Sequence, residues 1–127
     1  MAGPKGSKYY NVFLDYEVWL THRESGDRLT NQLVSLLAAI REKGSIRAAA
    51  ESLDLSYRKA WGDLRHAARF LGFPLVETTR GGKDGGLTRL TPEGAELVEA
   101  FRQLHDGINQ AIHDTTRKFF HQLNKSE

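Results

Sequence analysis

Three arginines and a glycine recur at helical spacing between positions 58 and 69 of this 127-residue chain. With about 100° of rotation per residue, Arg58, Gly62, Arg65 and Arg69 fall within an arc of about 60° on one helix face. None of the three arginines has a carboxylate four residues later with which to form an ion pair. Guanidinium groups bind phosphates and guanine edges. We therefore expect this face to contact DNA, with Gly62 allowing a close approach. The alternative is an ordinary solvated helix face.

The start of the same helix adds further candidates. Ser56 is a good N-cap, and the exposed N–H groups of a helix N-terminus also bind phosphate, so Ser56 can serve both roles. Tyr57 shares the arc of the apolar residues but lies in the first turn, which leaves a core position and a DNA contact equally open. Arg58 and Lys59 bring positive charge to this end of the helix. Trp61 lies at the centre of the apolar arc and is expected in the core.

A second basic group surrounds the glycine-rich segment 81–86 (GGKDGG). The runs 75–79 and 87–90 flank this segment and predict two short strands. The segment is neither a Walker A loop nor a dinucleotide-binding G-x-G-x-x-G motif, and it joins two strands. An ordinary hairpin loop and a wing that touches DNA both fit this pattern. The contacts of such a wing would come from Arg80, Lys83 and Arg89.

Three helices are expected to position these residues. The first begins after Thr30 and ends near Lys43, the second is capped by Ser45, and the third begins after Ser56 and ends at Gly72. A turn of three or four residues separates the second helix from the third, which is the outline of a helix-turn-helix. The side chains predicted to face the core of these helices are Leu33, Leu36, Leu37, Ile40, Ile46, Ala49, Ala50, Leu53, Ala60, Leu64, Ala67, Ala68 and Leu71.

The remaining elements complete a winged helix-turn-helix. Residues 1–8 are expected to be a disordered tail, and the alternating residues 9–20 predict a strand that joins the two wing strands in one small sheet. Residues 22–28 are expected to form a loop. Thr91 and Pro92 start a helix that extends to about residue 123, with an apolar stripe too long for a three-helix core. We therefore expect its distal half to pack on a partner chain.

The predicted fold is mainly α with a small antiparallel sheet, in a single domain over residues 9–127 that ends in a dimerisation helix. Basic residues concentrate in its middle. Residues 41–90 contain ten Lys or Arg and six Asp or Glu, a net charge of +4. Residues 91–127 contain four and six, a net charge of −2. This distribution favours a polyanionic partner for the central segment.

Other classes of protein are disfavoured. The chain has no cysteine, which excludes disulfides, thiolate zinc sites and cysteine nucleophiles. His105, His113 and His121 are eight positions apart, whereas helical metal ligands are spaced by three or four. We find no catalytic motif and expect no enzyme activity, no cofactor and no metal. No apolar run approaches the roughly 18 to 20 residues that span a bilayer. We expect no signal peptide, because the N-terminal residues lack the apolar h-region of one. We expect a cytoplasmic protein with no membrane partner.

Five segments carry a family resemblance. They are residues 44–50 (GSIRAAA), 55–61 (LSYRKAW), 75–78 (LVET), 81–86 (GGKDGG) and 90–94 (LTPEG). Through them the chain, from about residue 30 to 105, resembles the N-terminal DNA-binding domain of the ModE family of molybdate-responsive transcriptional regulators. That domain is a relative of the LysR-type winged helix.

The resemblance implies a DNA-binding homodimer whose third helix enters the major groove and whose glycine-rich tip touches the flanking backbone. By motif position, Ser56, Tyr57, Arg58 and Lys59 start the recognition helix, and Lys83 lies on the wing. Full-length ModE proteins also carry C-terminal domains that bind molybdate or tungstate. This sequence ends just after the long helix, so we expect no oxyanion sensing, and its residues identify no effector.

The expected function is therefore a DNA-binding transcriptional regulator of the ModE type without the molybdate-binding domain, bound to its operator in double-stranded DNA as a homodimer. Two alternatives stay open, a winged-helix module that binds protein and one that binds RNA. An exposed apolar groove without DNA affinity would favour the first, and the arginine row argues against it. Competition between duplex DNA and structured RNA separates the second from the main interpretation.

Overall fold

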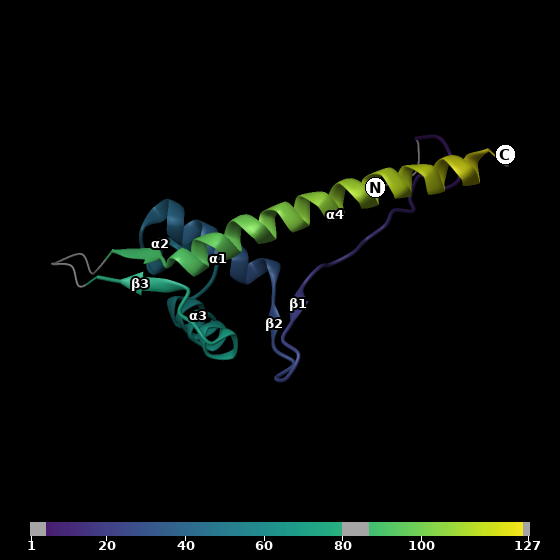
Figure 1. The fold of residues 1–127 in the computed structure, drawn as a ribbon. Helices are drawn as coiled ribbons and strands as arrows, with labels where there is room; N and C mark the ends of the chain where they lie inside the picture. The colour runs from purple at the N-terminus through teal and green to yellow at the C-terminus, as the bar shows by residue number, and fades with distance from the viewer. Residues whose placement is uncertain (1–4, 80–86, 126–127) are drawn as a thin grey trace. The chain divides into compact units, whose positions relative to one another are not determined.

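The computed structural model describes residues 5–79 and 87–125. Residues 18–101 form one compact unit, and the N-terminal residues up to 17 form another with residues from 102 onward. Figure 1 shows the helices and strands along the chain and labels all of them except β4. They are β1 (Leu20–Thr21), β2 (Arg28–Leu29), α1 (Asn31–Lys43), α2 (Ile46–Ser52), α3 (Tyr57–Leu71), β3 (Val76–Thr78), β4 (Thr88–Leu90) and α4 (Pro92–Asn124).

The boundaries of α1 follow from its capping residues, as predicted. The Thr30 hydroxyl accepts a hydrogen bond from the Leu33 backbone N–H at 3.3 Å, which satisfies one of the free donors of the first turn. Gly44 ends the helix in the left-handed region at φ 76°. An L side chain is strained at such a φ, whereas glycine adopts it at little cost.

The turn between α2 and α3 is held by local hydrogen bonds. The Ser45 and Ser56 hydroxyls cap the two helices, accepting from the N–H groups three residues later at 3.0 Å each. Within the turn, Asp54 has φ +60°, and the Leu55 N–H donates to the Ala50 carbonyl at 2.9 Å. Aspartate is among the residues that best tolerate this conformation. The predicted helix-turn-helix is thus confirmed, and its turn fixes where α3 begins.

The core of residues 18–101 lies where the helices meet. Ala49 of α2 and Ala60 of α3 are fully buried, and these small side chains let the helices approach closely. Trp61, which was predicted in the core, is only partly buried and packs against the core from its edge. The buried members are Leu29, Leu33, Val34, Leu36, Leu37, Ile40, Ile46, Ala49, Ala50, Ala60, Leu64, Ala67, Leu75, Val98 and Phe101.

The strands differ from the prediction. The described residues form two separate antiparallel pairs, β1 with β2 and β3 with β4, instead of one small sheet. The β3–β4 pair matches the predicted wing strands, with Glu77 opposite Arg89. The β1–β2 pair is only two residues long, and Leu20 lies opposite Leu29. A second, short hairpin therefore takes the place of the shared sheet.

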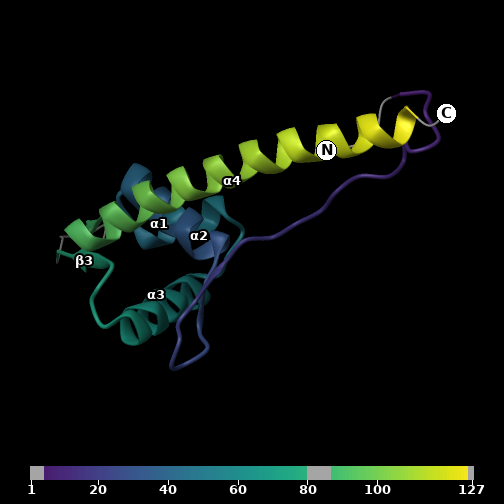
Figure 2. The same ribbon diagram turned by 45° about the vertical axis from the view of Figure 1, so that its right-hand side comes forward.

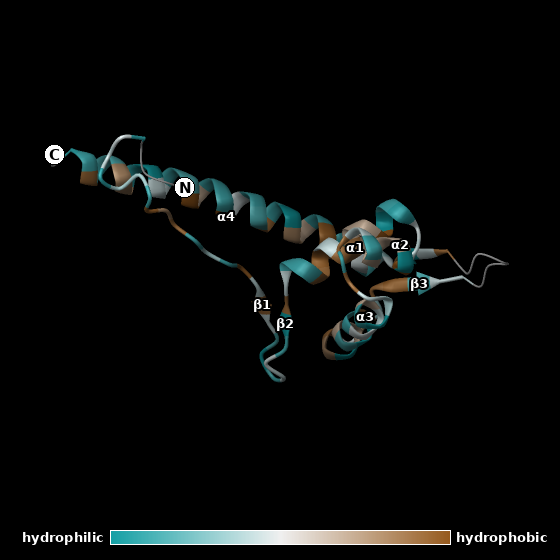
Figure 3. Cartoon of the chain, turned by 180° about the vertical axis from the view of Figure 1, so that it is seen from behind, coloured by the Kyte–Doolittle hydropathy of each residue, from teal (hydrophilic) through white to brown (hydrophobic). Residues whose placement is uncertain are grey.

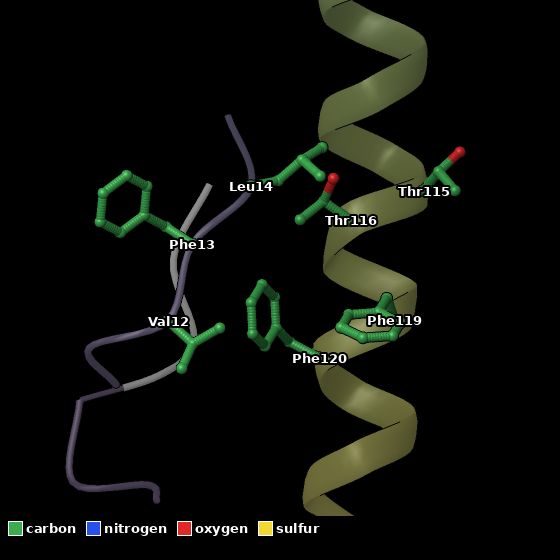
Figure 4. A pocket seen from close by; sticks show the side chains of 7 residues that line it. All are labelled: Val12, Phe13, Leu14, Thr115, Thr116, Phe119 and Phe120. Carbon is green, nitrogen blue, oxygen red and sulfur yellow. The ribbon is translucent and has the colours of Figure 1, made fainter. Parts of the chain in front are cut away.

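The predicted strand over residues 9–20 is wrong, because only Leu20 falls within β1. A strand needs a neighbouring strand to pair its backbone N–H and C=O groups. In this unit Val12 and Leu14 instead lie beside α4, near Thr116 and Phe120 (Figure 4). The side of a helix has no unpaired backbone groups to offer. The alternating pattern marked an apolar segment correctly, but not what it packs against.

The start of α4 is confirmed as well. The Thr91 hydroxyl accepts from the Gly94 N–H at 3.0 Å and donates to the Pro74 carbonyl at 2.8 Å. The Thr91 N–H donates to the Leu75 carbonyl at 3.0 Å, which ties the helix start to the chain before β3.

None of the helices in the described residues combines the length and the hydropathy that a membrane span requires.

The distal half of α4 is covered in part by the chain's own N-terminal segment. Thr116 and Phe120 are buried there, whereas Phe119 remains 56% exposed. Leu104, nearer the start of the helix, is 40% exposed. Apolar colour recurs along one side of the helix in Figure 3. Tyr16 also donates a hydrogen bond to the Asn109 side chain. The packing of this half on a partner chain stays a prediction.

The loop of the β1–β2 hairpin is attached to α3. His66 Nε2 donates to Asp27 Oδ1 at 2.8 Å, and the His22 and His66 rings both make edge contacts with Phe70. Figures 1 and 2 both show the hairpin beside α3. The hydrogen bond from His66, helped by one from Ser25, lowers the pKa of Asp27 below its ordinary value.

We predict that the stabilisation from this attachment disappears in acid. A carboxyl group whose pKa is lowered by folding stabilises the fold above its unfolded pKa, about 3.9, and this contribution is lost as the pH falls through the folded value. Asp27→Asn should therefore lower the unfolding temperature at about pH 5 and have little effect near pH 2. Thermal unfolding of both proteins across this range measures the difference. An effect of equal size at both ends would contradict the assignment.

Candidate nucleic-acid interface

The second helix of the helix-turn-helix, α3, presents a basic face to solvent. The side chains of Arg58, Arg65 and Arg69 are exposed. Of the carboxylates in the part of the chain that the structure describes, none lies within 4.0 Å of these three guanidinium groups. Their positive charge is therefore not neutralised within the chain. Such a row of donors is suited to the oxygens of a polyanion.

Gly62 lies within this row of arginines, where it adds no side chain to the helix surface. A Cβ atom built at Gly62 meets no other atom within 4 Å, so the glycine is not required for packing inside the chain. In the middle of a helix, glycine costs about 1 kcal/mol relative to alanine. Since the fold gains nothing from this residue, its use is consistent with a close approach of another molecule to the helix surface.

The first turn of α3 is more structured than the sequence indicated. Ser56 caps the helix, as predicted, and is itself exposed. Tyr57 is 40% exposed and is therefore not a core residue. Its ring contacts the Trp61 ring edge-on, with 6.4 Å between the centroids. The Tyr57 ring thus lies at the boundary between the core and the solvent, next to Arg58.

Two predicted contact residues are already paired. Lys59 Nζ lies 3.1 Å from Asp63 Oδ2 on the next turn of α3, and Arg89 Nε lies 3.2 Å from Glu77 Oε2 across the β3–β4 pair. Both ion pairs are exposed, and exposed pairs contribute only about 0–1 kcal/mol. Arg80 and Lys83, the other two predicted wing residues, lie outside the described residues.

Arg47 is a basic residue at this site that the sequence analysis did not single out. It lies in the first turn of α2, and its guanidinium carbon is 4.4 Å from the centroid of the Tyr57 ring. Helical periodicity relates residues within one helix, whereas this contact joins two helices across a turn. The only signal in the sequence was an arginine two residues after the cap at Ser45.

Comparison with known families shows to which family the chain belongs. The family model described as "Bacterial regulatory helix-turn-helix protein, lysR family" matches residues 31–95, about half of the chain. The chain belongs to this LysR family. The matched residues run from the start of α1 into α4 and include α3 with its basic face.

Relatives with curated names refine the comparison. The molybdenum transport protein ModE of Herbaspirillum seropedicae is 42% identical over 102 residues, which cover 80% of this chain and 36% of ModE. The molybdenum-pterin-binding protein MopB of Rhodobacter capsulatus is 40% identical over 88 residues, which cover 69% of this chain and 33% of MopB. The predicted resemblance to ModE is confirmed. The chain spans about a third of the length of these relatives.

Solved structures confirm the winged-helix fold. The crystal structure of the CbnR_DBD–DNA complex superposes with a TM-score of 0.56 at 22% identity, covering 71% of this chain and 97% of that one. At this identity the likeness concerns the fold alone. The LysR-type fold, mainly α with small antiparallel strand pairs and a long C-terminal helix, agrees with the predicted class.

Gly62→Ala should separate folding from binding at this site. We expect the variant to be more stable by about 0.4–1 kcal/mol, because alanine favours the helix and the added methyl group meets no neighbour. Its affinity for duplex DNA should nevertheless fall, since the methyl group would hold α3 away from the groove. Urea unfolding and fluorescence anisotropy measure the two quantities. Unchanged or tighter binding would show that no molecule packs closely at Gly62.

Proposed function

We propose that this chain is a DNA-binding transcriptional regulator that inserts α3 into the major groove of a specific operator. The observation that carries the proposal is the row of three exposed guanidinium groups on α3 without carboxylate partners among the described residues. Arginine binds guanine bidentately through O6 and N7, and it also binds phosphate. Membership of the LysR family of helix-turn-helix regulators supports the same assignment. Such a protein acts in the cytoplasm, where bacterial DNA is.

The proposed contacts to the groove and to phosphates are Arg58, Lys59 and Arg65. Gly62 and Arg69 lie on the same basic face of α3 as Arg58 and Arg65. Ser56 fixes the helix end and Tyr57 lies beside it. In the wing, Arg80, Lys83 and Arg89 are proposed to hold the flanking backbone. The ion pairs of Lys59 and Arg89 do not oppose these roles, because exposed pairs are weak and a phosphate can replace the carboxylate.

The functional form is proposed to be a homodimer joined through α4. Two of the exposed apolar side chains that support this are Leu104, before the middle of the helix, and Phe119, on its distal half. Regulators with two-fold symmetry bind half-sites about one DNA turn, or about 34 Å, apart. The operator is then a pseudo-palindrome, and one dimer should occupy it.

The test is a selection of bound fragments from genomic DNA with the purified protein, followed by competition at one fixed salt concentration. We expect a pseudo-palindromic duplex to be enriched and to be bound by two chains. Duplex DNA should compete far better than structured RNA of equal charge. Enrichment of no sequence, or stronger competition by RNA, would contradict the proposal.

A further inference from the structure

Arg47 and Tyr57 form a stacked pair across the helix-turn-helix. Arg47 lies in α2 and Tyr57 is the first residue of α3, and the guanidinium carbon is 4.4 Å from the ring centroid. Arginine stacks in this way on aromatic faces through cation–π attraction. Both side chains are exposed, so the pair lies on the surface of the motif.

The ring of Tyr57 is a fixed platform. Its contact with Trp61 has an interplanar angle of 89°, the edge-on geometry that aromatic pairs favour. Trp61 in turn packs against the buried core. The position of the Arg47 guanidinium is therefore determined through two aromatic rings, although it is a surface side chain on a flexible stem.

Stacking leaves the hydrogen-bonding groups of Arg47 available. The ring occupies one face of the planar guanidinium, whereas the N–H donors point outward from its edge. Glu51 lies one turn later on α2, yet neither it nor another carboxylate in the described ranges lies within 4.0 Å of Arg47. The two outward N–H groups of such a guanidinium match the spacing of two phosphate oxygens.

We infer that Arg47 binds a phosphate of the DNA backbone, and that Tyr57 is its positioning residue. This inference rests on the proposed function, in which α3 lies in the major groove. In a helix-turn-helix the helix before the recognition helix crosses the backbone, and Arg47 is at the start of that helix, α2. The contact adds affinity without reading sequence. Tyr57 thereby acts through Arg47 and not on a base.

The experiment is a double-mutant cycle with Arg47→Ala and Tyr57→Leu in the full chain, measured as affinity for the selected operator and for a random duplex. Arg47→Ala should weaken both by roughly tenfold. The plot of log K against log salt should also become less steep, by about 0.9 in slope for each phosphate that is no longer bound. Tyr57→Leu should weaken both duplexes by two- to fivefold, roughly the value of a cation–π contact. The double variant should bind like Arg47→Ala alone.

Arg117→Ala is the matched control, because it removes the same charge from an exposed position in α4, outside the helix-turn-helix. It should change the affinity only slightly, and circular dichroism should show that every variant is folded. The inference is overturned if Arg47→Ala leaves affinity and salt slope unchanged, or if the two single effects multiply in the double variant. Loss of binding in Arg58→Ala but not in Arg47→Ala would refute this inference alone. Absence of duplex binding by the unmodified chain would refute the proposed function.

Discussion

Arg58→Ala is expected to weaken operator binding by about 1–3 kcal/mol, or up to roughly a hundredfold, while leaving the fold intact. Arg58 is exposed, and no carboxylate among the described residues holds its guanidinium. Its removal therefore costs nothing inside the chain. The loss falls on the complex, where a groove arginine supplies two hydrogen bonds to one base. Fluorescence anisotropy with the selected operator measures the change.

The matched control is Arg117→Ala, which removes the same charge from an exposed position in α4. We expect this control to lower affinity only slightly. The specificity ratio, operator against random duplex, should fall in Arg58→Ala and stay constant in Arg117→Ala. If Arg58→Ala left operator affinity unchanged, the assignment of Arg58 to the groove would be wrong.

Of the variants whose stability is predicted, Gly94→Ala should lower the free energy of unfolding most. A Cβ atom at Gly94 would lie 2.3 Å from the backbone oxygen of Leu75 and 3.3 Å from the Thr91 hydroxyl. The Leu75 oxygen cannot move away easily. It accepts a hydrogen bond from the Thr91 N–H, and Leu75 is buried, with 1% of its surface exposed. Overpacking of this kind costs about 1–3 kcal/mol, and here the clash is with backbone. Urea unfolding should show a lower midpoint with a similar slope.

Gly107→Ala is the control on the same helix. A Cβ atom at Gly107 meets nothing within 4 Å, and α4 passes through this position without a break. Alanine should therefore stabilise the chain by about 0.4–1 kcal/mol. Opposite signs for the two glycines would confirm the close approach of α4 to the residues before β3. Equal effects at the two positions would contradict it.

The helices were predictable because their ends depend on local chemistry. The hydroxyl groups of Thr30, Ser45 and Ser56 cap the three helices as expected, and Gly44 and Gly72 end two of them at positive φ. Each of these features depends on a few neighbouring residues, and a sequence displays such neighbours directly. The exposed arginine row followed from the same helical periodicity.

The features that were predicted wrongly or not at all depend on partners outside the local sequence. The alternation over residues 9–20 showed an apolar segment, but it could not show that Val12 and Leu14 lie near a helix in place of a strand. The pair of Arg89 with Glu77 depends on strand register. The contact of Arg47 with Tyr57 depends on the turn angle between α2 and α3.

One paired cation could have been foreseen. Asp63 lies four residues after Lys59, which is the spacing of an ion pair on a helix. Charge alone therefore overstated how much of α3 is available to DNA. The three arginines differ from Lys59 because no acidic residue follows them at that spacing.

The most direct test of the central claim is the salt dependence of duplex binding by the triple variant Arg58→Ala, Arg65→Ala, Arg69→Ala. Each phosphate that the protein no longer binds makes the plot of log K against log salt less steep, by about 0.9 in slope. If the basic face of α3 binds DNA, the triple variant should lose operator specificity, and its slope should be smaller by about 1 to 3 for each chain in the complex. A triple variant that is folded and binds the operator with the affinity and slope of the unmodified chain would contradict the claim.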